Sequence, residues 1–259
     1  MCRLFGLRAN HPRGVYESLL GSPTALVHQS VCDRRRECHD NGWGIGYYAD
    51  GSPVRIRAAT AAADDPHYRE LAETVSASCV LAHIRKASAG SVAERNSHPF
   101  MYGRWLFAHN GTLYGFDKVP ERLNRLIPAA WQHPIEGETD SEHAFFFLMA
   151  QLANPESAVA PDELLNAMTR TIHTLAELYP GKGEERSQLN FLITDGQLMA
   201  ASRWGHSLCW LDLRRSAGPA EQAVEVASEP TTDENWAEIA DRSLICVTPN
   251  LEVLQCVIG

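Results

Sequence analysis

The sequence predicts an α+β fold in which layers of mainly antiparallel strands are covered by a few long helices. Short apolar segments are joined by tight-turn dipeptides, Asp50-Gly51 and Asp195-Gly196, which are typical of β-hairpins. Strands and helices do not alternate regularly, which argues against a TIM barrel or a doubly wound sheet. The 259 residues, 44% of them hydrophobic, can bury a large core. No repeat or composition shift divides the chain, so we expect one domain spanning 1–259.

The first half of the chain is predicted to form five strands and one helix. The helix begins at Asp64-Asp65-Pro66, where an aspartate caps the N-terminus and a proline occupies the first turn. It continues to about residue 75. The strands are expected at 3–7, 43–48, 54–58, 79–84 and 105–108.

The second half is predicted to form two helices and six strands. Thr139 lies three residues before Glu142, which is the pattern of a capped helix start, and the apolar residues 144–152 continue this helix. A second helix spans 161–179, with Asp162 and Glu163 in its first turn and an apolar face behind them. The strands are expected at 189–194, 198–202, 207–213, 223–227, 244–248 and 253–257.

Charge and cysteine content exclude several classes of protein. The formal net charge of −9 disfavours binding to a nucleic acid backbone, and the one dense basic run, Arg34-Arg35-Arg36, is interpreted as a solvated loop. Neither a membrane span nor a secretory signal is present, so we expect a cytoplasmic protein. The seven cysteines form no framework, which indicates reduced thiols. Cys32, Cys38 and His39 lack zinc-site spacing, so no metal is expected.

Cys2 is a candidate nucleophile. Removal of Met1 would leave a thiol and a free α-amine on the same residue. The amine titrates near ~8 and a cysteine near ~8.5, so the amine can accept the thiol proton without a histidine. Taken alone, the position is better explained as a core residue of the first strand.

Two further segments carry groups suited to acyl chemistry. Arg85 ends an apolar strand, where its guanidinium can hold a substrate carboxylate through two parallel bonds; a structural ion pair is the alternative. Asn110-Gly111 offers a side-chain amide and an unhindered backbone N–H, which together can form an oxyanion hole. As an isolated dipeptide, however, Asn-Gly is more often a turn.

Asp140 and a glycine-rich strand complete the set of candidates. Asp140 lies at a predicted helix start, where it can bind a substrate ammonium group, act as a cap, or both. The segment 41–46 lacks the following helix that a phosphate-binding loop needs. We therefore interpret Gly42-Trp43-Gly44 as a closely packed strand with one aromatic residue.

Five segments, taken in their order along the chain, resemble those of the class II glutamine amidotransferases, which belong to the N-terminal nucleophile (Ntn) hydrolases. The resemblance is strongest to the stand-alone, YafJ-like branch, which is related to the γ-glutamyl hydrolase of ergothioneine synthesis. It spans nearly the whole chain and includes Ser228-Glu229-Pro230 and Trp236. The segments are Met1-Cys2-Arg3-Leu4-Phe5-Gly6, Gly42-Trp43-Gly44, 83–88, Asn110-Gly111 and Glu138-Thr139-Asp140-Ser141-Glu142.

This resemblance implies a four-layer αββα sandwich and a role for each candidate residue. Cys2 would be the nucleophile, with its α-amine as the base, and Asn110 and Gly111 would form the oxyanion hole. Arg85 would bind the substrate α-carboxylate and Asp140 its α-ammonium group. His98 matches a family position near the site and is grouped with the substrate-binding residues, without an assigned chemical step, and no cofactor is implied.

The implied activity is hydrolysis of the γ-amide of glutamine or of a γ-glutamyl compound through a thioester. Two residues depart from the family pattern: Asn41 replaces an aspartate of many relatives, and Lys86 replaces an aromatic residue of the biosynthetic enzymes. Two alternatives stay open. The chain could be a glutaminase subunit that passes ammonia to a separate synthase, or a non-catalytic glutamine-binding protein. A cysteine protease with a Cys–His pair is less consistent with the sequence.

Overall fold

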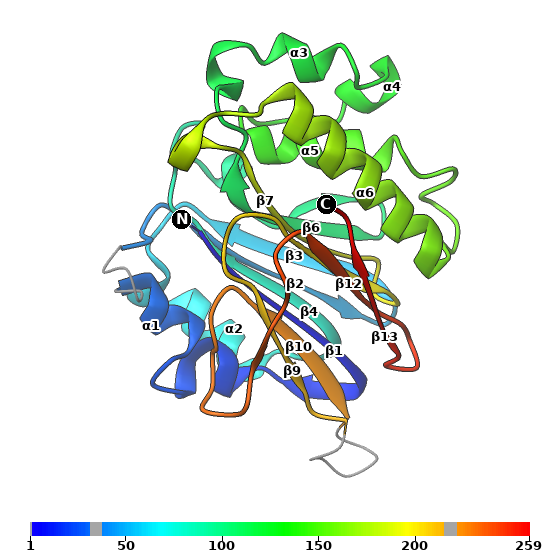
Figure 1. Cartoon of the computed structure of the whole chain (residues 1–259). Coiled ribbons are helices and arrows are strands. Elements are labelled where there is room, and N and C mark those ends of the chain that lie inside the picture. The colour runs from blue at the N-terminus through cyan, green and yellow to red at the C-terminus, as the bar shows by residue number, and fades with distance from the viewer. Residues whose placement is uncertain (1, 32–37, 215–221) are drawn as a thin grey trace.

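The computed structural model describes residues 2–31, 38–214 and 222–259, and within them two antiparallel sheets are stacked face to face (Figure 1). The basic run 34–36 and Cys32 lie outside these residues. The first sheet has the strand order β11-β9-β10-β1-β4-β2-β3 and the second has the order β13-β12-β8-β7-β6-β5. The strands of the first sheet are β1 (Arg3–Gly14), β2 (Trp43–Ala49), β3 (Ser52–Ala58), β4 (Ser76–Ile84), β9 (Cys209–Asp212), β10 (Ala223–Ala227) and β11 (Ala237–Glu238). Those of the second are β5 (Phe100–Tyr102), β6 (Trp105–Thr112), β7 (Gln188–Thr194), β8 (Met199–Arg203), β12 (Ser243–Val247) and β13 (Val253–Val257).

Helices cover the outer face of each sheet. The first sheet is covered by α1 (Leu26–Val31) and α2 (Pro66–Thr74), and the second by α5 (Asp140–Met149) and α6 (Pro161–Leu178). Two short helices, α3 (Glu121–Asn124) and α4 (Ala129–Gln132), lie against α5 on the far side from the sheet (Figure 1). The shorter helical turns are Glu17–Gly21, Ala62–Asp64, Glu94–Asn96, Phe116–Lys118 and Gly183–Glu185. The four layers confirm the predicted αββα sandwich.

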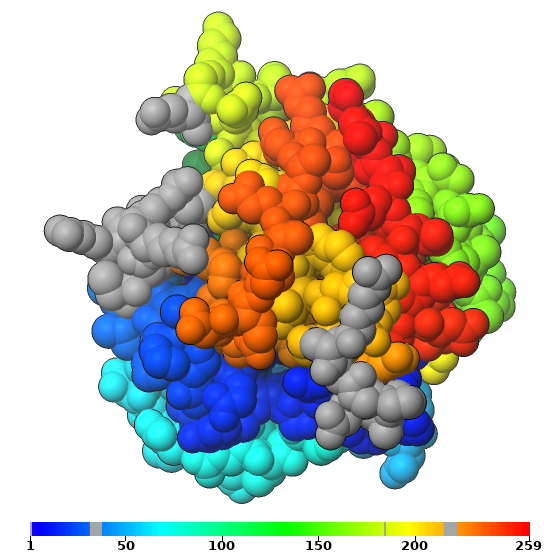
Figure 2. Space-filling model, turned by 60° about the horizontal axis from the view of Figure 1, so that its bottom comes forward, coloured from blue at the N-terminus to red at the C-terminus, as the bar shows by residue number. Residues whose placement is uncertain are grey.

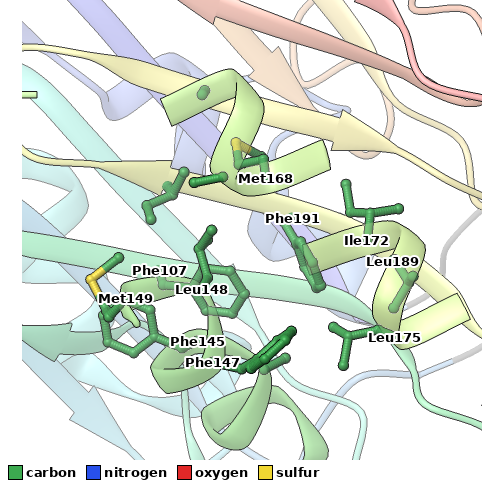
Figure 3. Packing of buried hydrophobic residues seen from close by; sticks show 14 of the residues in the cluster. Phe107, Phe145, Phe147, Leu148, Met149, Met168, Ile172, Leu175, Leu189 and Phe191 are labelled. Atoms are coloured by element: carbon green, nitrogen blue, oxygen red, sulfur yellow. The ribbon is translucent and has the colours of Figure 1, made fainter. Parts of the chain in front are cut away.

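The core consists of three apolar layers that follow the two-residue period of the strands. Leu4 faces the opposite sheet, whereas its neighbour Phe5 faces the helices. Between the second sheet and its helices, Phe107 and Phe145 stack with their ring centroids 5.1 Å apart. Figure 3 shows this layer, where Phe191 of β7 lies near Ile172 of α6. Burial of these side chains stabilises the fold at about 25 cal/mol per Å² of apolar surface.

The helix starts follow the sequence prediction closely. Asp65 accepts the backbone N–H of His67 and precedes Pro66, as expected for a capped N-terminus. Thr139 accepts the N–H of Glu142 at 3.2 Å, so the predicted hydroxyl cap is confirmed. In a reciprocal capping box, the Glu142 carboxylate would accept the backbone N–H of Thr139. Here it accepts the N–H groups of Glu136 and Gly137 instead.

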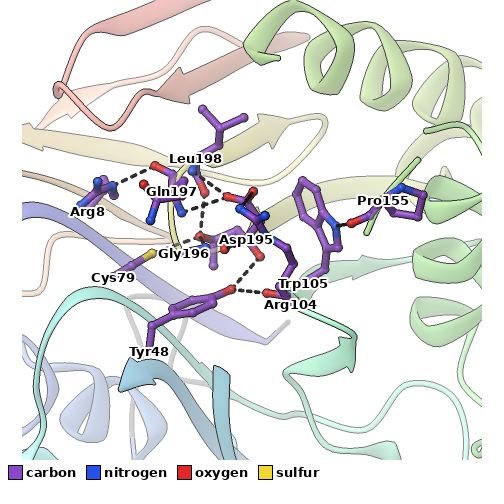
Figure 4. Close-up of polar contacts among 11 residues, drawn as sticks. Arg8, Tyr48, Cys79, Arg104, Trp105, Pro155, Asp195, Gly196, Gln197 and Leu198 are labelled. Carbon is purple, nitrogen blue, oxygen red and sulfur yellow. Dashed lines mark hydrogen bonds and ion pairs between the residues drawn. The ribbon is translucent and has the colours of Figure 1, made fainter. Parts of the chain in front are cut away.

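A polar network ties the two sheets together at one end of the strands (Figure 4). Tyr48 at the end of β2 donates to the carbonyl oxygens of Arg104 and Thr194. Arg104 pairs with Asp195 at 2.6 Å, and Arg8 of β1 donates to the carbonyl of Gln197. A cavity of about 810 Å³ lies at this end, lined in part by Tyr48, Arg104 and Asp195.

Glu225 of β10 is buried beneath residues 17–21, and this placement predicts a pH dependence of stability. Burial raises the pKa of this carboxyl from 4.5 to about 7, although Arg13 and the Ser18 hydroxyl lower it in part. The folded state therefore holds a proton that the unfolded state releases between these pH values. The free energy of unfolding should fall as pH rises from about 4.5 to about 7, by up to about 3 kcal/mol from this group. It should then level off above that range.

Urea unfolding at pH 5 and pH 8 checks this expectation. Glu225→Gln removes the titrating group, so the variant should be more stable than the wild type at pH 8 and should show a smaller difference between the two pH values. Equal pH dependence in the two proteins would contradict the assignment.

Candidate active site

The candidate residues meet at the end of the sandwich opposite the Tyr48 network. Arg3 of β1 pairs with Ile84 of β4, which places Cys2 opposite Arg85 at the ends of two neighbouring strands. Alternation along the strands puts Cys2 on the same face as Leu4, which points between the sheets. On β6 the same rule puts Asn110 on the face of Leu106 and Ala108, which also points between the sheets. Cys2, Arg85 and Asn110 therefore converge on one end of the layer between the two sheets.

Cys2 is 6% exposed, and its sulfur lies against the backbone of Lys86. The Lys86 N–H donates to Sγ at 3.4 Å, and Sγ is also 3.4 Å from the Lys86 carbonyl oxygen. Burial raises the pKa of the Cys2 thiol, while the Lys86 N–H and the Arg85 charge lower it and Asp140 raises it. Because burial has the largest effect, a nearby base is needed to generate the thiolate.

Arg85 is buried, and its guanidinium holds the loop that follows it. Nη1 donates to the carbonyl of Ser91 at 2.9 Å, and Nη2 donates to that of Ala89 at 2.8 Å. These bonds go to backbone oxygens, whereas the alternative considered from the sequence was a structural ion pair. A guanidinium has five N–H donors, so further donors remain for a carboxylate. Burial lowers the pKa of Arg85, although Cys2 and Asp140 raise it.

Asn110 and Gly111 lie inside β6 and not in a turn, because β6 continues to Thr112, four residues beyond the predicted strand end. Asn110 is 1% exposed; its Nδ2 donates to Ser228 Oγ at 3.1 Å, and its Oδ1 has no hydrogen-bond partner within the described residues. A Cβ at Gly111 would lie 2.0 Å from the Gln188 carbonyl oxygen. Only glycine allows β6 and β7 to approach this closely here.

Asp140 is the first residue of α5, and its buried carboxylate reaches the end of β6. Oδ2 accepts the N–H of Leu113 at 2.6 Å, and Oδ1 accepts the N–H of Ser141 at 2.8 Å. The charges of both Asp140 and Arg85 act on the pKa of the Cys2 thiol, so both groups lie near it. Asp140 is therefore positioned beside the strand end that carries Asn110.

His98 lies in a cluster of aromatic rings. Its ring is 4.1 Å from that of His83 and 4.6 Å from that of Phe100. Neither ring nitrogen has a hydrogen-bond partner within the described part of the chain, and burial lowers the pKa well below its usual value. The ring is therefore neutral, and the predicted role of His98 in substrate binding stays a prediction.

The two residues that depart from the family pattern both lie beside Arg85 and Cys2. Asn41 Oδ1 accepts the N–H of Ala87 at 2.9 Å, and the Asn41 N–H donates to the Arg85 carbonyl. Lys86 contacts Cys2 through its backbone.

The glycine-rich strand is closely packed as predicted, because a Cβ at Gly44 would lie 2.1 Å from the His98 carbonyl oxygen. Within the described residues, no group of three or more His, Cys, Asp or Glu side chains is arranged to hold a metal ion.

A buried ion pair, which the sequence did not indicate, holds the backbone of the nucleophile candidate. Arg3 is fully buried; its Nη2 lies 2.9 Å from Glu229 Oε1, and its Nη1 donates to the Cys2 carbonyl at 2.9 Å. Glu229 follows β10 by two residues. The orange segment of the chain lies beside the blue N-terminal segment (Figure 2). The only available signal was Ser228-Glu229-Pro230 directly after a predicted strand.

Loss of this ion pair should destabilise the protein. Glu229→Ala removes a carboxylate that pairs with the buried Arg3, and breaking a buried ion pair by removing one partner typically costs about 3 kcal/mol. Urea unfolding measures the change. Glu238→Ala is the matched control, because Glu238 pairs with Arg203 at 3.3 Å but is 83% exposed, and its loss should change stability by less than about 1 kcal/mol. Similar values for the two variants would contradict a structural role for Arg3–Glu229.

The αββα sandwich of two stacked antiparallel sheets has the architecture of the Ntn-type amidotransferases. The whole chain matches *Bacillus subtilis* glutamine phosphoribosylpyrophosphate amidotransferase with a TM-score of 0.67 at 16% identity, over 49% of that chain. A predicted glutamine amidotransferase of *Pseudomonas aeruginosa* matches 98% of the chain with a TM-score of 0.63 at 26% identity, over 99% of that chain.

Sequence comparison gives the family. The model of the class II glutamine amidotransferases matches residues 1–211, so the chain belongs to this family. It is 30% identical, over 96% of its length, to a γ-glutamyl-hercynylcysteine sulfoxide hydrolase of *Mycobacterium tuberculosis*, of which it covers 93%. It is also 30% identical, over 94% of its length, to the putative glutamine amidotransferase YafJ of *Escherichia coli*, of which it covers 91%. No helix within the described residues is long and apolar enough to span a membrane.

Proposed function

We propose that this enzyme hydrolyses the γ-amide bond of a γ-glutamyl compound, with Cys2 as its N-terminal nucleophile after removal of Met1. The observation that carries the proposal is the convergence of Cys2, Arg85 and Asn110 on one end of the inter-sheet layer, with Asp140 beside them. A thiol, a cationic group, an anionic group and an amide donor are the four groups needed to bind and cleave a glutamyl side chain.

In the proposed mechanism, the α-amine of Cys2 accepts the thiol proton and the thiolate attacks the γ-carbonyl carbon. The oxyanion that forms is stabilised by the amide of Asn110 and the N–H of Gly111. The C–N bond then breaks, the amine leaves with the proton held by the α-amine, and a γ-glutamyl thioester remains on Cys2. Water hydrolyses this thioester and releases glutamate, which restores the thiol.

The substrate is assigned through charge and size. Arg85 would hold the α-carboxylate and Asp140 the α-ammonium group, so the glutamyl half of the substrate is recognised and the leaving amine can vary. The chain covers more than 90% of the mycobacterial hydrolase and of YafJ. Because the mycobacterial relative is named a hydrolase, we favour a hydrolase over a glutaminase subunit that supplies ammonia to a synthase partner.

A labelling experiment tests the proposal. The purified protein is incubated with 6-diazo-5-oxo-norleucine, a glutamine-like electrophile, and its intact mass and adduct site are measured. Loss of Met1 with one adduct on Cys2 supports the nucleophile and a glutamyl-shaped pocket. Hydrolysis of glutamine and of γ-glutamyl peptides is then compared to identify the leaving group. Retained Met1 without an adduct would favour a non-catalytic binding protein instead.

A further inference from the structure

We propose that Ser228 is a positioning residue that holds the side-chain amide of Asn110 with its NH₂ group directed at the reacting carbonyl. The inference rests on the proposed function, because it explains how the oxyanion donor is oriented. Ser228 lies one residue after β10, seventeen residues beyond the part of the chain that matches the family model. Its hydroxyl connects the two sheets at the active-site end.

The hydrogen bonds of Ser228 are the first step of the argument. Ser228 Oγ accepts the backbone N–H of Leu4 at 3.0 Å and lies 3.1 Å from the amide group of Asn110. Ser228 is 1% exposed, so its hydroxyl proton also needs an acceptor. With Nδ2 of Asn110 facing Ser228, the hydroxyl receives two N–H donors, and no acceptor for its own proton is found within the described residues.

The second step is the other half of the same amide. With Nδ2 toward Ser228, Asn110 Oδ1 is buried without a partner in the described chain. Rotation of the amide by 180° exchanges its oxygen and nitrogen without moving any other atom. The Ser228 hydroxyl then donates to Oδ1 and still accepts from Leu4, so every group around Ser228 is satisfied. The group left without a partner becomes an NH₂ donor instead of a carbonyl oxygen.

An unpartnered donor is what an oxyanion hole requires before substrate binds. A buried amide NH₂ held in place by its oxygen needs no reorganisation when the oxyanion forms, and this preorganisation is the source of its effect on the rate. The Leu4 N–H occupies one lone pair of Ser228 Oγ, and the orientation of the amide is then set by the hydroxyl proton, whose acceptor is Asn110 Oδ1. Ser228 would thus link the position of the nucleophile strand β1 to the position of the oxyanion donor on β6.

Steady-state kinetics of four proteins test the proposal: the wild type, Ser228→Ala, Asn110→Ala and the double variant, with a γ-glutamyl amide as substrate. Ser228→Ala should lower kcat about 10- to 100-fold, because the amide donor is no longer directed at the oxyanion. KM should change by about twofold or less, because the donor contributes only when the oxyanion forms. In the Asn110→Ala background the same change should have no further effect on kcat, since Ser228 acts through Asn110.

Ser18→Ala is the matched control. Ser18 is also buried, and its hydroxyl bonds to a side chain of β10, but that side chain is Glu225, away from the site. Its kcat should equal that of the wild type. A loss on Ser228→Ala that persists in the Asn110→Ala background would show that Ser228 acts on Cys2 through Leu4 and would overturn the proposal. So would full activity of Ser228→Ala beside an impaired Asn110→Ala, a result that leaves the proposed function intact. Absence of turnover in the wild type overturns both.

Discussion

Replacement of Cys2 by alanine is expected to reduce hydrolysis of γ-glutamyl amides by at least about 10⁴-fold, because the thioester can no longer form. Within the described residues, the Cys2 thiol makes no hydrogen bond shorter than 3.4 Å, and the alanine variant keeps the backbone carbonyl that Arg3 binds. The variant should therefore fold with a stability close to that of the wild type. Ammonia or amine release measures the reaction, and thermal unfolding measures the stability.

Cys256→Ala provides the control for loss of a thiol. Cys256 is a free cysteine on β13, which is the edge strand of the second sheet and is separated from β6 by three strands. Its replacement should leave both turnover and labelling by the glutamine-like electrophile unchanged. Residual activity of Cys2→Ala above about one percent of the wild type would show that another group attacks the substrate, and the N-terminal nucleophile would have to be abandoned.

The strands and long helices were predictable because their patterns are local. The strand expected at 43–48, the proline after Asp65 and the hydroxyl cap at Thr139 each depend on a few neighbouring residues, and all appear in the structure. The short elements α1, α3 and α4 were not predicted, because segments of four to six residues carry too little periodicity. Strand ends were also misplaced, since β1 continues to Gly14 through a register shift that no local pattern shows.

The candidate site was predictable in its residues but not in its connections. Cys2, Arg85 and Asn110 were identified by type and order, and the strand register brings them together. The bonds of Arg85 to the loop at 89–91, and those of Ser228 and Glu229, depend on how segments up to 226 residues apart meet. Such contacts follow from sheet order, which a single sequence does not specify.

Asn110 provides the second large expected effect. Asn110→Ala removes one donor to the oxyanion, which typically lowers kcat about 100- to 1000-fold, equivalent to about 3–4 kcal/mol of transition-state stabilisation. KM should change little, because the donor acts mainly when the tetrahedral intermediate forms. Stability should change by about 1 kcal/mol or less, since the amide makes one hydrogen bond within the described chain and leaves its other polar atom unpartnered.

Asn190 offers a direct comparison, because it pairs with Asn110 across β6 and β7 and is equally buried. Its amide makes four hydrogen bonds to backbone groups of residues 204–207. Asn190→Ala should therefore lower stability by about 2 kcal/mol and reduce kcat far less than Asn110→Ala does. This opposite pattern separates an amide that supports the fold from one reserved for the reaction. Equal losses of turnover in the two variants would indicate that both act by holding β6 and β7 together, and the oxyanion donor would then have to be sought elsewhere.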